Sequence, residues 1–337
     1  MFKPFMTTGI GSLPLTAPEE ACRLVLDTFD IPFWPQFPKL SFYESMIPQF
    51  SEGMPFMKID SQRESLWIEK ENGNALTDFY ETYSEDWRSS ISDGYAKGLY
   101  TLTRLLKDSK LNTLKGQITG PLTFTLGLKD SEGRPVYFDE ELREISLMLL
   151  KAKVRWQMDF LKPYATTIVF FVDEPILSAL GSTSYLGVEP QETLRLLKEI
   201  VDSVKHAGGI PGIHCCGKAD WPLVINSGVD IISFDAYGYI ETISLYPAEF
   251  AKFLQGGGYL AWGIVPTTES IRDENIDSLK IRFDKGTELL SKRIPADLLL
   301  SRILLTPSCG TGSRSVKETL KIFQLLKSLK ETVHNGR

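Results

Sequence analysis

Short apolar runs rich in β-branched residues alternate along this chain with longer stretches whose apolar residues recur every three or four positions. The short runs predict buried strands, at residues 113–119, 166–172, 210–214, 229–234, 259–264 and 302–306. The longer stretches predict amphipathic helices, at residues 139–161, 189–207, 269–293 and 315–332. Gly208 and Gly209 follow the second of these helices, as is typical of a helix C-terminus.

This regular alternation predicts parallel strand pairing and a (β/α)8 fold, the TIM barrel. A strand candidate before Gly9 and a weaker one at residues 31–37 bring the predicted strands to about eight. Residues 38–82 are rich in aromatic residues, methionine and proline and follow no clear period, so we expect an excursion over the barrel mouth. We find no internal repeat or linker and predict that residues 1–337 form a single domain.

Composition and charge exclude several classes of partner. Of the 337 residues, 42% are hydrophobic and 24% are charged, and the net charge is −6 at pH 7 with no basic stripe. This argues against a nucleic-acid partner. No apolar run approaches the roughly 18 residues that cross a bilayer, and the N-terminus does not resemble a signal peptide. We therefore expect a cytoplasmic protein with no membrane partner.

The four cysteines are Cys22, Cys215, Cys216 and Cys309. A cytosolic chain of this size does not need disulfides, and the adjacent pair cannot easily bridge because neighbouring side chains diverge in extended backbone. We therefore predict free thiols, at least one of which binds a metal ion.

In a barrel of this kind the active groups come from the carboxyl ends of the strands. Residues two apart in a strand face the same side, so His214 and Cys216 both face the barrel axis while Cys215 points away. Cys309 follows the last predicted strand and would arrive from across the barrel. Imidazole and thiolates are preferred zinc ligands, and three protein ligands are typical of a catalytic site. The alternative is burial for packing, which is common for free cysteine. Three such residues on one rim favour zinc.

Carboxylates and a glycine turn share this rim. Asp235 is either a fourth, displaceable zinc ligand or a structural residue that caps a helix or forms an ion pair. Asp173 and Glu174 are adjacent and must face opposite sides, so we expect only Asp173 to enter the site and to pair with a substrate ammonium. The backbone N–H groups at Gly11 and Ser12 suit a carboxylate.

Five motifs occur in the order found in the cobalamin-independent methionine synthase superfamily, and the chain resembles the C-terminal catalytic barrel of that superfamily. The motifs are Thr7-Thr8-Gly9-Ile10-Gly11-Ser12-Leu13-Pro14, Thr119-Gly120-Pro121-Leu122-Thr123, Val172-Asp173-Glu174-Pro175, His214-x-Cys216, and Thr306-Pro307-Ser308-Cys309-Gly310. The resemblance spans nearly the whole chain.

The resemblance implies methyl transfer to the thiol of homocysteine, giving methionine. By the same resemblance, zinc is held by His214, Cys216, Asp235 and Cys309. A free thiol has a pKa of about 8.5, and coordination to zinc deprotonates it outright. Ile10, Gly11 and Ser12 would hold the carboxylate of the amino acid and Asp173 its ammonium.

Several departures from the family concern the methyl donor and the metal ligands. The family has glutamate where this chain has Asp235, and a tryptophan that is absent after Gly120-Pro121. Neither the N-terminal half of the full-length family nor its histidine-glycine-glutamate segment has a counterpart here. A flat pterin needs an aromatic platform. We therefore predict that the donor is methylcobalamin or another methyl-corrinoid, free or on a corrinoid protein, rather than methyltetrahydrofolate.

Two alternatives remain open. His214-x-Cys216-Gly217 also resembles the corrinoid:thiol methyltransferases related to uroporphyrinogen decarboxylase, whose acceptor is a thiol such as coenzyme M. A non-catalytic protein that binds zinc or a methyl carrier is the alternative from another class.

Overall fold

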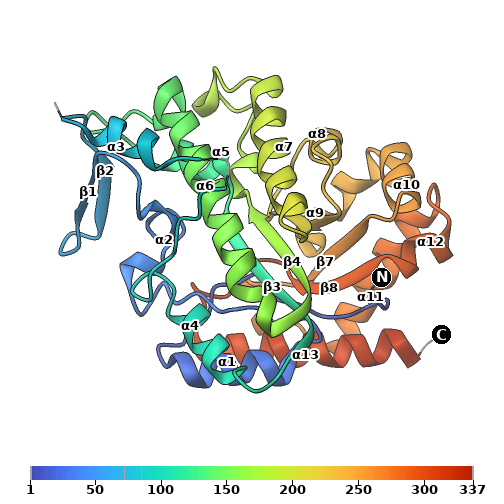
Figure 1. Ribbon diagram of the computed structural model, residues 1–337. Coiled ribbons are helices and arrows are strands. Elements are labelled where there is room, and N and C mark those ends of the chain that lie inside the picture. Colours follow the sequence, from blue (N-terminus) through green and yellow to red (C-terminus); the bar gives the residue numbers. More distant parts are fainter. Residues whose placement is uncertain (1, 72, 85, 336–337) are drawn as a thin grey trace.

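A curved sheet of six parallel strands forms the centre of the molecule (Figure 1). The computed structural model describes residues 2–71, 73–84 and 86–335. The strands lie in the order β3 (Leu111–Thr119), β4 (Ala165–Asp173), β5 (Ile210–Cys215), β6 (Ile231–Phe234), β7 (Tyr259–Val265) and β8 (Ile303–Pro307). They match the six apolar runs predicted as strands, so the α/β class and the parallel pairing are confirmed.

The two N-terminal segments predicted as strands flank this sheet without forming strands of their own. The first makes an isolated parallel bridge from Thr7 to Leu305 of β8, and the second makes one from Phe33 to Lys115 of β3. Proline interrupts the second segment at Pro32 and Pro35, and a proline has no N–H to give to a ladder. The described residues therefore show the six-stranded part of the predicted eight-stranded barrel.

The helices that cover the sheet include those predicted from periodicity at residues 139–161, 189–207, 269–293 and 315–332, together with others that the periodicity did not predict. They are α1 (Pro18–Thr28), α4 (Lys97–Leu105), α5 (Pro121–Gly127), α6 (Glu140–Leu161), α7 (Pro190–His206), α8 (Trp221–Asn226), α9 (Ala236–Ser244), α10 (Pro247–Gln255), α11 (Ile276–Ser291), α12 (Ala296–Ser301) and α13 (Val316–Asn335). The helix predicted at 269–293 is wrong in its first part. A 3-10 turn (Glu269–Arg272) precedes α11, because Asn275 and Ser278 form a capping box that starts the helix there.

Alternating strand residues pack on the two faces of the curved sheet. On β4, Val169 and Phe171 belong to a small cluster inside the curve, whereas Phe170 and Val172 belong to the larger core under the helices. Continuing this period of two directs Asp173 inward and Glu174 outward.

Residues 38–82 contain more regular structure than their sequence pattern predicted. They form a 3-10 turn (Phe42–Glu44), α2 (Pro48–Ser51), a hairpin of β1 (Met57–Asp60) and β2 (Ser65–Ile68), and α3 (Ala75–Thr82). The hairpin projects away from the central sheet in Figure 1, at the left. Near the start of this region, the carbonyl of Met46 accepts a hydrogen bond of 2.7 Å from the hydroxyl of Thr119, at the carboxyl end of β3. This contact ties the region to the strand ends.

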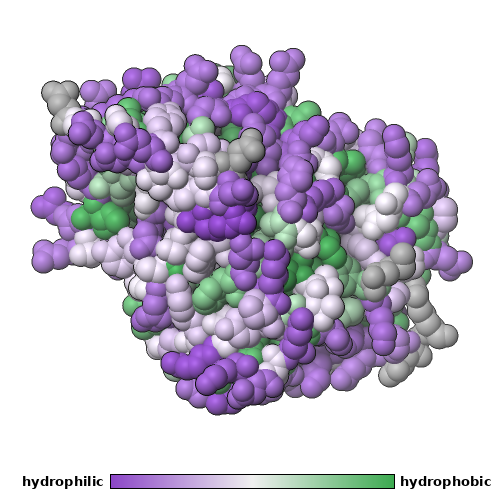
Figure 2. Space-filling view, viewed as in Figure 1, coloured by the Kyte–Doolittle hydropathy of each residue, from purple (hydrophilic) through white to green (hydrophobic). Residues whose placement is uncertain are grey.

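Polar and charged residues predominate on the face seen in Figure 2, and hydrophobic residues form only small groups there. Among the described residues, none of the helices is long and apolar enough to cross a membrane.

Candidate metal centre

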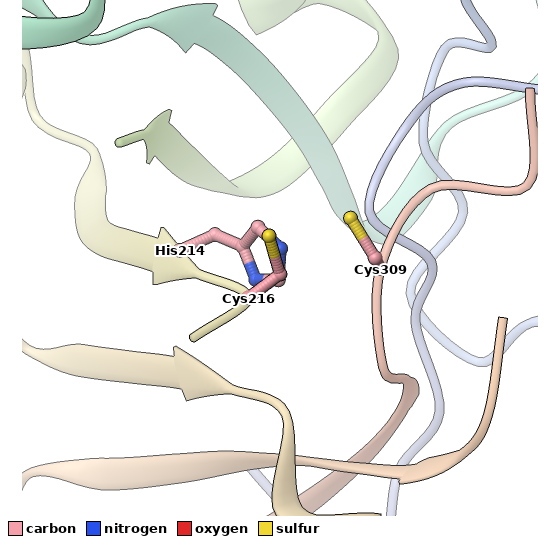
Figure 3. Close-up of side chains that lie close together, drawn as sticks. All are labelled: His214, Cys216 and Cys309. Carbon is pink, nitrogen blue, oxygen red and sulfur yellow. The ribbon is translucent and has the colours of Figure 1, made fainter. Parts of the chain in front are cut away.

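His214, Cys216 and Cys309 converge at the carboxyl ends of two strands. His214 lies near the end of β5 and Cys216 directly follows it, while Cys309 comes from the loop after β8. The three side chains point toward one another (Figure 3), and their ligand atoms lie within 4.8 Å of each other. The structure therefore brings together the three residues that the sequence predicted as zinc ligands.

The imidazole of His214 is oriented as a metal ligand requires. Its Nδ1 lies 2.9 Å from the hydroxyl of Ser233 on β6. Its Nε2 is buried and has no hydrogen-bond partner among the residues that the structure describes. A ligating histidine commonly uses one ring nitrogen for such a hydrogen bond and the other for the metal. An orphaned buried nitrogen in this position fits a zinc site.

The two thiols of the cluster differ in their readiness to ionise. A hydrogen bond from Cys309 and the nearby imidazole of His214 lower the pKa of Cys216 to about 4. The hydrogen bond to Cys216 and burial raise the pKa of Cys309 well above its usual range. Zinc is bound by thiolates, so a zinc ion here would replace the proton shared by the two sulfurs. The donor set of one imidazole and two thiols fits zinc.

Cys215 and Cys22 lie outside this cluster. Cys215 belongs to the core under the helices, as strand alternation predicted, and burial raises its pKa to about 12. Burial has the same effect on Cys22. Both behave as buried packing residues.

Asp235 caps a helix beside the cluster. It is the N-cap of α9, and its carboxylate accepts a hydrogen bond of 2.8 Å from the N–H of Gly238. Burial raises its pKa to about 6. Of the two roles left open by the sequence, the geometry favours the N-cap, and Asp235 is not part of the group of three potential ligands.

The three potential ligands face a cavity of about 220 Å³. Predicted substrate residues share its wall, and so do residues of the region 36–46. The lining residues are Ile10, Ser12, Gln36, Pro38, Glu44, Ser45, Met46, Asp173, Pro175, His214, Cys216, Cys309 and Gly310. Gly11 lies next to this wall, where an added Cβ would come within 2.3 Å of Oε1 of Gln36.

Asp173 and Glu174 occupy opposite sides of the strand end, as predicted. Asp173 lines the cavity, and its Oδ1 is buried without a hydrogen-bond partner among the described residues. Burial raises its pKa, while the positive charge of Lys115 acts to lower it. Glu174 instead accepts hydrogen bonds from the N–H groups of Leu122 and Thr123, at 2.9 and 2.7 Å, and from the Thr123 hydroxyl at 2.6 Å. One carboxylate therefore faces the cavity and the other anchors the start of α5.

Three successive carbonyls in residues 10–12 are held by hydrogen bonds. The carbonyl of Ile10 accepts from Nζ of Lys115 at 2.7 Å, and that of Gly11 accepts from the N–H of Gln36 at 3.1 Å. The Ser12 carbonyl accepts from the N–H of Thr311 at 2.8 Å. Within the described part of the chain, the N–H groups of these three residues donate to no acceptor. Such a row of free backbone N–H groups suits an anion.

Two residues of this region were not predicted from the sequence. Lys115 lies fully buried inside the sheet. A lysine within an apolar strand is unusual, and this feature of the sequence could have indicated its role. Glu44 lies in the cavity wall, where its carboxylate accepts hydrogen bonds from the N–H groups of Phe37 and Lys97 at 2.7 and 2.8 Å. Burial raises the pKa of Glu44 to about 7. Its stretch of sequence has no period that would have indicated burial.

Comparison with known proteins supports the predicted fold. No family model and no curated protein sequence matches the chain. Among solved structures, a B12-independent methionine synthase from Shewanella sp. W3-18-1, in complex with selenomethionine, is similar with a TM-score of 0.61. The two share 16% sequence identity over 99% of this chain and 98% of that one.

Two structures of pneumococcal StrH, an exo-β-D-N-acetylglucosaminidase, reach TM-scores of only 0.49 and 0.48. Their sequence identities are 13% and 14% over 97% of this chain, and they cover 83% and 84% of the other chains. Such a likeness does not discriminate between functions. The likeness to the B12-independent methionine synthase shows a shared fold.

Proposed function

We propose that this protein is a zinc-dependent methyltransferase that moves a methyl group to the thiol of homocysteine and so forms methionine. The observation that carries this proposal is the convergence of His214, Cys216 and Cys309 on a small cavity. The same cavity has a buried carboxylate and free backbone N–H groups for the two charges of an amino acid. The structural neighbour is named as a methionine synthase and was solved with selenomethionine, which has these two charges.

Each part of the cavity has a task in this reaction. Zinc held by His214, Cys216 and Cys309 would supply an open coordination position that keeps the substrate thiol deprotonated. Asp173 pairs with the substrate ammonium, and the N–H groups of residues 10–12 bind its carboxylate. These contacts aim the sulfur at the incoming methyl group. A sulfur–carbon bond forms, and the electron pair of the broken methyl bond stays with the donor.

The N-terminal part of the chain would complete the barrel around this site. We propose that the two segments that bridge to β8 and β3 take the places of the first two strands of a (β/α)8 barrel. Residues 38–82 belong in this proposal to the same single domain and cover its mouth, since Glu44, Ser45 and Met46 line the cavity. Their coverage would limit the access of water to the reacting thiol.

The methyl donor and the thiol acceptor are the variables that an experiment has to decide. A methyl-corrinoid donor stays a prediction from the sequence, whereas the structural neighbour is named as B12-independent. Zinc-loaded protein should be offered methylcobalamin or methyltetrahydrofolate, each with homocysteine or coenzyme M, and the methylated products read by mass spectrometry.

The proposal expects methionine from at least one donor. Methylation of coenzyme M alone would support the sister family of corrinoid:thiol methyltransferases. Zinc binding without methyl transfer to any thiol would contradict the enzyme proposal and support a binding protein.

A further inference from the structure

Lys115 is a charged residue in the interior of the sheet. It lies in the middle of β3 with no exposed surface, and burial lowers the pKa of its ammonium. Burying such a group is costly unless hydrogen bonds compensate for the lost water. The presence of a buried lysine here therefore indicates a specific structural or functional role.

The ammonium of Lys115 connects β3 to three other parts of the barrel interior. Its Nζ donates to the carbonyl of Ile10 at 2.7 Å and to Oε1 of Gln117, also on β3, at 2.9 Å. It lies 5.5 Å from the ring centre of Phe33 and 4.7 Å from that of Phe171 on β4. Its backbone N–H also donates to the carbonyl of Pro32 at 2.7 Å. Lys115 thus sits where both N-terminal segments meet the sheet.

The bond to Ile10 decides which way the next peptide groups point. With the carbonyl of Ile10 held by the ammonium, the peptide plane that it shares with the N–H of Gly11 is fixed. The carbonyls of Gly11 and Ser12 are held by backbone donors in the same way. These bonds fix the N–H groups of Gly11 and Ser12, which remain without a partner in the described chain and lie beside the cavity wall formed by Ile10 and Ser12. The N–H that shares the plane of the Ser12 carbonyl is that of Leu13, which donates to the carbonyl of Gln36 at 2.9 Å.

We propose that Lys115 is a positioning residue, which holds residues 10–12 in the conformation whose N–H groups bind the carboxylate of the amino-acid thiol. This rests on the proposed function for the identity of the ligand. Lys115 itself does not line the cavity and acts through the Ile10 carbonyl.

A second buried lysine provides a matched control. Lys153 on α6 also has no exposed surface, and its Nζ donates to the carbonyl of Ser90 at 3.0 Å. Burial lowers its pKa to about 8. Lys153 lies outside the cavity wall, so Lys153→Met removes a buried ammonium without touching residues 10–12.

The test compares Lys115→Met with Lys153→Met by titration calorimetry, using two ligands on zinc-loaded and on metal-free protein. The ligands are homocysteine and 3-aminopropane-1-thiol, which is homocysteine without its carboxylate. We expect Lys115→Met to weaken homocysteine by about tenfold or more and the other thiol by less than about threefold. Lys153→Met should weaken neither by more than about threefold. Equal losses for both ligands, or unchanged homocysteine binding in Lys115→Met, would overturn the proposal.

A second variant keeps the test valid if Lys115→Met does not fold. Gln117→Met removes one acceptor of the ammonium and leaves the charge in place, so the same selective loss for homocysteine should appear at a smaller size. An unselective effect or none would again count against the proposal. Methyl transfer by the wild-type protein is measured separately. If it is absent while the selective loss persists, the proposed function fails and the role of Lys115 stands.

Discussion

The cavity has two walls that are built in different ways. The sheet wall contains Asp173, His214, Cys216 and Cys309, at or just after the carboxyl ends of β4, β5 and β8. Strand pairing aligns this wall, since Asp173 and His214 are register partners in the ladder. The N-terminal wall contains residues 10–12 and lining residues between 36 and 46. Backbone hydrogen bonds between Gly11, Leu13 and Gln36 join its two segments, and buried side chains hold it at single further contacts. Lys115 binds the carbonyl of Ile10, and Glu44 binds the N–H of Phe37.

Because of this difference, substitutions in the two walls should have different effects, on the chemical step in one case and on the shape of the substrate site in the other. A ladder of backbone hydrogen bonds keeps strand ends in place even when one side chain is replaced. Changes in the sheet wall should therefore remove a chemical function and leave the fold intact. A wall held by a few buried polar contacts should lose its shape when one contact is removed, because each such contact has no substitute.

The largest effect should follow removal of a ligand from the sheet wall. Cys309→Ala should lower zinc content from about one equivalent to near none, because two ligands cannot hold the ion in a catalytic geometry. Metal analysis by mass spectrometry measures this. Cys215→Ala is the matched control and should keep its zinc, since its side chain packs under the helices. Full zinc retention in Cys309→Ala would contradict the site as described.

The next effect concerns the unpartnered carboxylate of the sheet wall. Asp173→Asn keeps the shape and removes a charge whose pairing with an ammonium contributes roughly 1.5–3 kcal/mol. Homocysteine should therefore bind about ten- to a hundredfold more weakly, while coenzyme M, which has no ammonium, should be little affected. Titration calorimetry with both thiols checks this. Losses of equal size would show that Asp173 is not the ammonium partner.

Glu44 tests the N-terminal wall through the pH dependence of stability. Burial raises its pKa to about 7 from the usual 4.5, so the folded state holds more protons than the unfolded state between these values. Its contribution to stability is present below pH 4.5 and is lost as the pH rises through 7. In Glu44→Gln the free energy of unfolding should no longer fall with pH through this group. The difference between the two proteins across this pH interval should be on the order of a few kcal/mol.

Urea denaturation of wild type and Glu44→Gln at several pH values measures this difference. Parallel stability curves for the two proteins between pH 4.5 and 7 would contradict the role of Glu44.

The smallest effect should come from Asp235, at the edge of the sheet wall. Asp235→Ala removes the N-cap of α9 and should lower the free energy of unfolding by about 1 kcal/mol. Zinc content should stay near that of the wild type. Asp235→Asn keeps a capping oxygen and should recover most of the stability. Loss of zinc in both variants would instead make Asp235 a metal ligand.

The sheet wall could be predicted from the sequence because the positions of its residues follow from the local periodicity of the strands. A period of two places His214 and Cys216 on one side and Cys215 on the other, and the same rule separates Asp173 from Glu174. The six strands followed from apolar runs of strand length. Capping residues could also have located the start of α11, since Asn275 and Ser278 are visible in the sequence.

The N-terminal wall could not be predicted in this way. The contact between Lys115 and Ile10 joins residues far apart in the chain, and no local period indicates it. Glu44 is buried by contacts with Phe37 and Lys97 rather than by a helical or strand pattern. Proline in the second N-terminal segment also replaced an expected strand by an isolated bridge. Such contacts follow from the tertiary fold.

The central claim is that the thiol of the substrate joins the zinc held by His214, Cys216 and Cys309. Zinc X-ray absorption spectroscopy tests it most directly, by counting sulfur ligands before and after homocysteine is added. Cys216 and Cys309 predict two sulfur ligands in the resting protein, and homocysteine should raise this number to three. A sulfur count that stays at two with bound homocysteine would contradict the account.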